Sequence, residues 1–194
     1  MKGWLHSVSV LIMIAGTVSC GSTEVYRQSA KTLDSLSGAL NQCTEEIRRM
    51  DTVTLAKALT RYNVHKQFIA HNNIDTLSRS EGDALQQFTT AGKNLEVVQS
   101  NRSAVLMRSE LLNTQINHLR KDIKNEAIEP GTLPEFMENE KKEVSNLIRK
   151  ANEQVRLFYA SVEELKLCLP TVEQVIRRKN KGQLPIVVKD TTSL

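Results

Sequence analysis

Aromatic residues, glycine and proline are scarce in this chain. Phe, Trp and Tyr make up 4% of its 194 residues, and there are only 8 Gly and 4 Pro. Strands and their turns favour aromatic, β-branched, Gly and Pro residues, so this composition argues against a β-rich fold and suits long helices. The shortage of aromatic faces also disfavours a carbohydrate site and a platform for single-stranded nucleic acid.

Recognisable catalytic motifs are missing as well. The sequence contains no G-x-S-x-G, P-loop, G-x-G-x-x-G or C-x-x-C pattern. None of His65, His71 and His118 has the Glu three residues earlier that carboxylate di-iron bundles use, so we interpret them as solvated or capping side chains. Adjacent carboxylates such as Glu163 and Glu164 are interpreted as solvated helix faces. The sequence therefore predicts a protein that is not an enzyme and holds no metal or other cofactor.

Long hydrophobic runs and a strong net charge are also absent. The longest apolar run, VSVLIMIAG at 8–16, is far shorter than the roughly 20 residues that a membrane-spanning helix needs. It follows Lys2 and precedes small residues, which is the order found in a secretory signal peptide. The 26 basic and 22 acidic residues give a net charge of +4, too mild and too dispersed for a nucleic-acid partner.

The four residues after this run are Thr17, Val18, Ser19 and Cys20. This TVSC stretch resembles the lipobox of bacterial lipoproteins, although that family prefers Leu or another aliphatic residue where Thr17 stands. The resemblance implies that residues 1–19 are removed, that the Cys20 thiol carries diacylglycerol and that the new amino terminus is acylated, for example with palmitate. Gly21, in place of an Asp retention signal, implies the outer membrane facing the periplasm. An ordinary signal peptide with an incidental cysteine is the alternative.

Apolar residues recur at steps of three and four, which is the spacing of packed helices. The pattern covers 26–50, 55–69, 84–123 and 137–169. It predicts an all-α fold: an elongated antiparallel up-and-down bundle of three or four main helices with coiled-coil-like heptad seams. Residues 20–23 would be a lipidated tether, 24–180 the bundle domain, and 181–194 a flexible or strap-like tail.

Breaks in the apolar pattern predict where helices begin and end. The pattern slips at Asp51, where we expect a boundary, or else a single long helix with one extra residue. Asn72 and Asn73 mark the next break, and Ser80–Asp83 matches a capping box. Glu129–Glu135 holds Pro and Gly followed by a second box. Pro170 is expected to end the third long helix and to leave a short last helix capped by Thr171.

Three polar residues fall on the apolar seams. Arg102 and Ser109 interrupt the second long seam, and a helix break near Asn101 is left open. Arg102 either reaches water where the bundle opens, or anchors an anionic ligand in a pocket between helices. Glu140 lies between Met137 and Val144 on the third long seam, and we interpret it as exposed at the end of the bundle.

Basic residues gather where the last helix ends. Cations there suit the helix dipole, and the alternative is contact with an anionic lipid or a cell-wall polymer. The residues are Arg177, Arg178, Lys179 and Lys181.

Export makes a disulfide between Cys43 and Cys168 chemically permissible. In aligned parallel helices, however, these residues differ in height by about 22 Å, whereas bridged Cα atoms lie within about 7 Å. We therefore favour two buried thiols and keep the disulfide as the alternative.

The function that these patterns favour is a lipid-anchored envelope scaffold or adaptor. It would bind another envelope protein or the cell wall, and it could also self-associate along its seams. The alternative is a sensory bundle that binds a small ligand in a pocket near Arg102 and Ser109.

Overall fold

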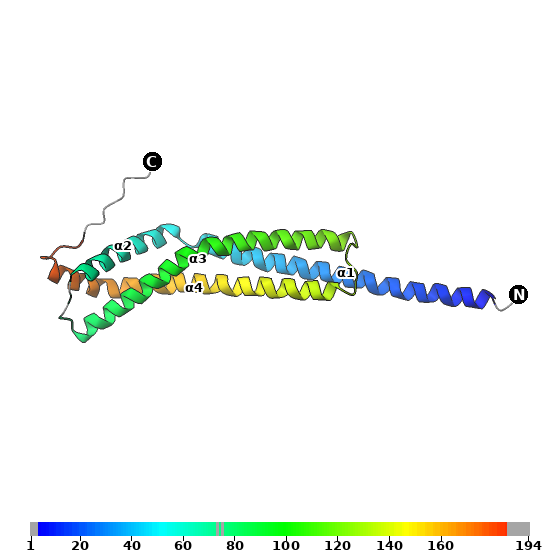
Figure 1. Cartoon of the computed structure of the whole chain (residues 1–194), viewed down its shortest axis with the longest axis horizontal. Coiled ribbons are helices and arrows are strands. Elements are labelled where there is room, and N and C mark those ends of the chain that lie inside the picture. The colour runs from blue at the N-terminus through cyan, green and yellow to red at the C-terminus, as the bar shows by residue number, and fades with distance from the viewer. Residues whose placement is uncertain (1–3, 73, 75, 186–194) are drawn as a thin grey trace, which may run out of the picture. The chain divides into compact units, whose positions relative to one another are not determined.

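The computed structural model describes residues 4–72, 74 and 76–185, and its description of side chains begins at Thr23. Within this part of the chain there are four α-helices and no strand, and the helices pack as a bundle (Figure 1). The all-α prediction is thereby confirmed. The helices are α1 (Trp4–Arg49), α2 (Thr52–His71), α3 (Arg79–Lys124) and α4 (Leu133–Lys179).

The chain divides into two compact units, each made of two sequence segments. Unit 1 comprises Met1–Thr44 and Met107–Lys150, and unit 2 comprises Glu45–Leu106 and Ala151–Leu194. Each unit has its own apolar core: unit 1 is built from segments of α1, α3 and α4, and unit 2 from α2, segments of α3 and α4, and the last turn of α1.

Unit 1 packs α1, α3 and α4 side by side. Tyr26 Oη donates to the Ile128 carbonyl at 2.6 Å, and Asn113 Nδ2 donates to Asn41 Oδ1 at 2.9 Å. Arg120 Nη2 on α3 donates to Asp34 Oδ1 on α1 at 2.7 Å. The later residue of α1, Asn41, thus pairs with the earlier residue of α3, Asn113, so these two helices are antiparallel. The fully buried apolar residues of this unit come from all three helices: Leu33, Leu40, Leu112, Ile116, Leu133 and Val144.

Unit 2 packs α2, α3 and α4 around an aromatic pair. The rings of Tyr62 and Phe88 lie with their centroids 5.2 Å apart. Arg178 Nη1 on α4 donates to Glu81 Oε1 near the start of α3 at 2.8 Å, as expected for antiparallel neighbours. Fully buried aliphatic residues complete this core: Leu95, Val98, Val172, Val175 and Ile176.

The predicted helix boundary at Asp51 is confirmed. Helix α1 ends at Arg49, and Asp51 caps α2 by accepting hydrogen bonds from the Val53 and Thr54 amides at 2.9 and 3.0 Å. The hydroxyl of Thr54 also donates to Asp51, and these bonds lower the pKa of the Asp51 carboxyl. A capping carboxylate satisfies amides that the first helical turn leaves without partners.

The start of α3 lies two residues before the predicted one. The capping box is formed by Ser78 and Glu81, not by Ser80–Asp83: the Ser78 amide donates to Glu81 Oε2 at 2.8 Å, and the Glu81 amide donates to Ser78 Oγ at 3.3 Å. Both pairs have the same spacing, but only Ser78–Glu81 ends in the glutamate of the usual capping box, so the sequence favoured the observed pair. The Arg178 guanidinium, with help from the Ser78 amide, lowers the pKa of Glu81 to about 2.

The interruption expected at Pro170 does not occur, because α4 continues through this residue to Lys179. Helix α3 is also continuous through Asn101, where a break was left open. A proline inside a helix removes one backbone hydrogen bond and is costly. Here Cys168 and Val172 are buried on either side of Pro170. Ending the helix at Pro170 would expose these side chains, and their packing therefore outweighs the lost bond.

Helix α4 ends where the sequence predicts. Lys181 and Gly182 have positive φ angles of 50° and 85°, and the Gly182 amide donates to the Arg177 carbonyl at 2.8 Å. This six-to-one bond is the closing bond of a Schellman C-cap. The possible strap formed by Ile186–Val188 lies outside the described residues.

Candidate functional site

Cys20, the residue that the lipobox resemblance singles out, has a side chain outside the described part of the structure. The same holds for the signal-peptide prediction, whose side chains all precede Thr23. Within the described residues, no helix combines the length and apolar character needed to cross a membrane.

The other two cysteines lie in separate units. In the described part of the chain, Cys43 of unit 1 and Cys168 of unit 2 are buried thiols that form no disulfide. The Cys168 thiol donates weakly to the Leu165 carbonyl at 3.6 Å, and burial raises its pKa to about 11. Cys168 is therefore almost entirely in the unreactive thiol form at neutral pH.

Arg102 is half-buried in unit 2, next to the end of α1. Its Nε donates to the Ile47 carbonyl at 3.4 Å, close to the last residue of that helix. Carbonyls of a last turn have no partner inside their helix, so this contact is one way of capping α1. A hollow of about 200 Å³ adjoins the guanidinium, and Thr52, Leu55, Ala56, Gln99 and Ser103 complete its lining.

Ser109, the second residue of the predicted pocket, belongs to unit 1 and is buried there. Its hydroxyl forms a short hydrogen bond with the hydroxyl of Thr44. Thr44 also donates to the Leu40 carbonyl at 2.7 Å. The hydroxyl of Ser109 is thus paired within the core of its own unit.

The basic residues at the end of α4 are partly engaged in local contacts. Arg177 Nη1 donates to the Gly182 carbonyl at 3.0 Å, and Arg178 bridges Glu81 and the Thr76 carbonyl. Both guanidinium groups therefore help to hold helix ends in unit 2. Lys179 and Lys181 are exposed.

His65 was expected to be solvated, and the structure contradicts this expectation. Its side chain is only 3% exposed, and its Nε2 lies 3.2 Å from Glu173 Oε1. The same carboxylate oxygen accepts a hydrogen bond from Arg61 Nε at 3.0 Å. Burial tends to raise the pKa of Glu173, but the hydrogen bonds from Arg61 and His65 outweigh it and lower the pKa overall.

A largely apolar pocket of about 500 Å³ opens beside this cluster. Basic side chains lie near an apolar wall, which makes the pocket a candidate site. His65 Nδ1 is buried without a hydrogen-bond partner among the described residues. The lining residues are Ala56, Lys57, Thr60, Arg61, His65, Glu173, Leu184 and Pro185.

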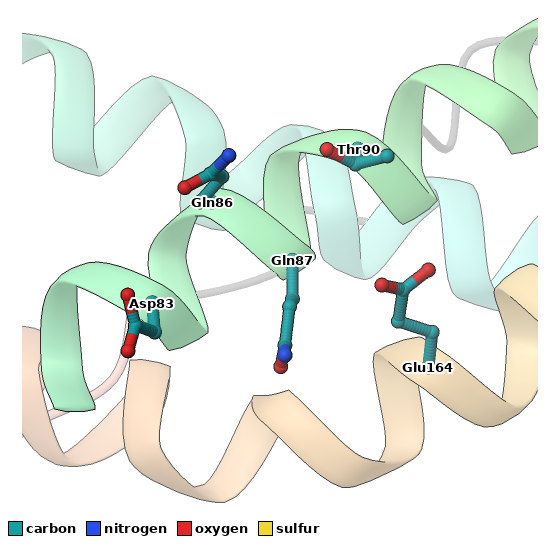
Figure 2. A pocket seen from close by; sticks show the side chains of 5 residues that line it. All are labelled: Asp83, Gln86, Gln87, Thr90 and Glu164. Atoms are coloured by element: carbon teal, nitrogen blue, oxygen red, sulfur yellow. The ribbon is translucent and has the colours of Figure 1, made fainter.

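A second hollow of about 360 Å³ lies between α3 and α4 in the same unit. Figure 2 shows Gln87 pointing from α3 toward α4, and Glu164 rising from α4 toward α3. Asp83, Gln86 and Thr90 complete its lining. All five side chains are polar and no basic side chain is among them, so this hollow resembles a hydrated groove more than a ligand pocket.

Glu140 was also expected to be exposed, and it is buried in unit 1 instead, with 6% of its side chain exposed. The Gln115 side-chain amide donates to Oε1, whereas Oε2 has no hydrogen-bond partner among the described residues. The position of Glu140 on the apolar seam indicated burial. We interpreted the residue as exposed because its side chain is charged, and this interpretation is wrong. An ionised carboxylate in such a place costs free energy.

We expect Glu140→Leu to raise the free energy of unfolding of unit 1 by about 1–3 kcal/mol, because it replaces a buried carboxylate with an apolar side chain of similar size. Gln115 is exposed, so its amide can turn to water once the carboxylate is gone. Urea unfolding followed by circular dichroism measures the change. The matched control is Glu138→Leu on the same helix, whose exposed carboxylate should matter little. A destabilised Glu140→Leu protein would contradict this reading of the buried charge.

Several large apolar side chains are exposed on helix faces. In unit 1, Met107 and Leu111 lie one turn apart on α3 and are 63% and 57% exposed. Residues spaced by four on a helix share a face, so these two form one apolar patch. In unit 2, Leu167 on α4 is 79% exposed.

Within the described residues, no group of three or more His, Cys, Asp or Glu side chains is placed to hold a metal ion. Comparisons with protein-family models, with curated proteins and with solved structures found no match to this chain.

Proposed function

We propose that this protein is a bacterial envelope lipoprotein that acts as a helical scaffold or adaptor. Cys20 carries the lipid that holds the protein at the membrane. From this anchor the helical bundle extends and binds another envelope protein. The outer membrane, facing the periplasm, is the location implied by the residue after the cysteine, Gly21. The proposed location rests on the TVSC stretch, and the binding role rests on the exposed apolar patch of unit 1.

The patch formed by Met107 and Leu111 is the observation that carries the binding role. Two large apolar side chains at positions i and i+4 are the usual anchors for an amphipathic helix of a partner. Arg108 lies between them and forms a salt bridge with Glu143 at 2.7 Å, which places charged groups at the border of the patch. An apolar centre with a polar rim is the arrangement of many protein interfaces.

Site-specific crosslinking in the native host tests this role. A photoreactive phenylalanine at position 111 should give one discrete crosslinked species, which mass spectrometry can identify. The same residue at position 121, an exposed lysine on α3 in the same unit, is the matched control and should give none.

A second arm asks whether the patch itself is needed. With the photoreactive residue kept at position 111, Met107→Glu should weaken the crosslink strongly, because a charge in an apolar interface has no partner there. Equal crosslinking at positions 111 and 121, or no crosslink at either, would count against a partner on this face.

A further inference from the structure

The pocket beside Arg61 and His65 in unit 2 is independent of the apolar patch in unit 1. It lies between α2 and α4, next to Leu184 and Pro185 beyond the end of α4. Its volume of about 500 Å³ falls within the range of small-molecule sites. Its surface is mainly apolar, with Ala56, Leu184 and Pro185 providing aliphatic groups. An apolar chain therefore fits the space.

The charged groups around the pocket indicate which polar group such a ligand carries. Glu173 is already paired with Arg61 and in contact with His65. Lys57 also lines the pocket; it forms no salt bridge with any residue that the structure describes, and its charge contributes to the lowered pKa of Asp51, which lies outside the lining. The lining thus has one positive charge in excess, which favours a ligand with a single negative charge.

His65 also lines the pocket, where Glu173 holds its ring. Its Nε2 faces Glu173, so the hydrogen on that nitrogen is the one donated to the carboxylate. Its Nδ1 is buried and has no partner among the described residues. This nitrogen has almost no accessible surface, so a ligand in the pocket does not reach it.

We propose that this pocket binds a small amphipathic carboxylate, with its carboxylate near Lys57 and its apolar chain against Ala56, Leu184 and Pro185. This site is separate from the proposed scaffold role and does not depend on it. The carboxylate of such a ligand meets the positive charge of the lining and its alkyl chain meets the aliphatic wall, whereas a purely apolar or cationic ligand would gain nothing from that charge.

Nuclear magnetic resonance of the full chain in detergent micelles tests the proposal, with octanoate as the probe. The signals followed are the Leu184 methyl groups and the His65 ring, because they report on the pocket and not on partitioning into the micelle. We expect saturable shifts at both. Affinity should rise by up to about fourfold for each methylene from hexanoate to octanoate. Octyltrimethylammonium, with the same chain and the opposite charge, should bind much more weakly.

Two variants test separately the contribution of the ligand's alkyl chain and that of its negative charge. Ala56→Phe fills the pocket and should abolish the shifts, whereas Ala70→Phe, at an exposed site outside the pocket on the same helix, should not. Lys57→Gln should weaken octanoate binding by about two- to fivefold, the range for an exposed charge pair, and Lys93→Gln should leave it unchanged. Each variant keeps the Arg61–Glu173 pair and the buried core intact.

Three results would overturn the proposal. One is non-saturable shifts, another is unaltered binding in Ala56→Phe, and a third is equal affinity for the carboxylate and the ammonium probe. A variant of the protein that ends at Pro185 tests whether the protein's own residues 186–194 occupy the pocket in place of the ligand. If octanoate binds only to that shortened chain, residues 186–194 fill the pocket in the intact protein and the proposed ligand does not.

Discussion

We expect that replacing Cys20 with Ser reduces palmitate incorporation to background in a bacterial host. The expected cause is direct: if the TVSC stretch is a lipobox, the Cys20 sulfur is the atom that accepts the diacylglycerol, and a serine hydroxyl does not replace it. Two or three acyl chains would bind the membrane almost irreversibly, because each buried methylene contributes about 0.8 kcal/mol. Metabolic labelling with an alkyne palmitate, followed by capture of the protein, measures the change.

Cys43→Ser and Cys168→Ser are the matched controls for this experiment. Both thiols are buried in helical cores, so neither should be a site of lipid attachment and both variants should keep the label. Palmitate that persists in Cys20→Ser, or disappears in either control, would show that the lipid is attached elsewhere.

We expect Gly92→Ala to destabilise unit 2 by about 1–3 kcal/mol, against the usual preference of helices for alanine. A Cβ at position 92 would lie 2.0 Å from Tyr62 Cε2, far inside contact distance. The Tyr62 ring is 1% exposed and packs on Phe88, so it has little room to move. The midpoint of urea unfolding, followed by circular dichroism, measures the loss.

The same substitution elsewhere in α3 should have the opposite sign. Gly82 has nothing within 4 Å of the position that a Cβ would take, so Gly82→Ala should stabilise by up to about 1 kcal/mol. Removing the ring with Tyr62→Val should largely cancel the cost of Gly92→Ala in the double variant. A Gly92→Ala protein as stable as Gly82→Ala would refute the close packing of Tyr62.

The apolar periodicity predicted the helices well, because burial at steps of three and four depends on local geometry. The boundary at Asp51 followed from the slip in the same pattern. Pro170 was misjudged because its cost is local, whereas the burial of Cys168 and Val172 that outweighs it depends on tertiary packing.

The candidate pocket was harder to predict. His65 occupies the position where the steps from Tyr62 to Ile69 require a buried residue, so a signal for its burial was present in the sequence. Its partner Glu173 lies 108 residues away, and no local pattern connects the two. The pocket wall also uses Leu184 and Pro185, beyond the last helix. A site assembled from such distant segments requires the tertiary structure.

Mass spectrometry of the amino-terminal peptide, from protein purified out of its native membranes, tests the central claim most directly. The account predicts a peptide that begins at Cys20 and carries the added mass of a diacylglyceryl group and an amide-linked acyl chain. A peptide that begins at Met1, or at Cys20 with an unmodified thiol, would contradict the proposed anchor and the envelope address that depends on it.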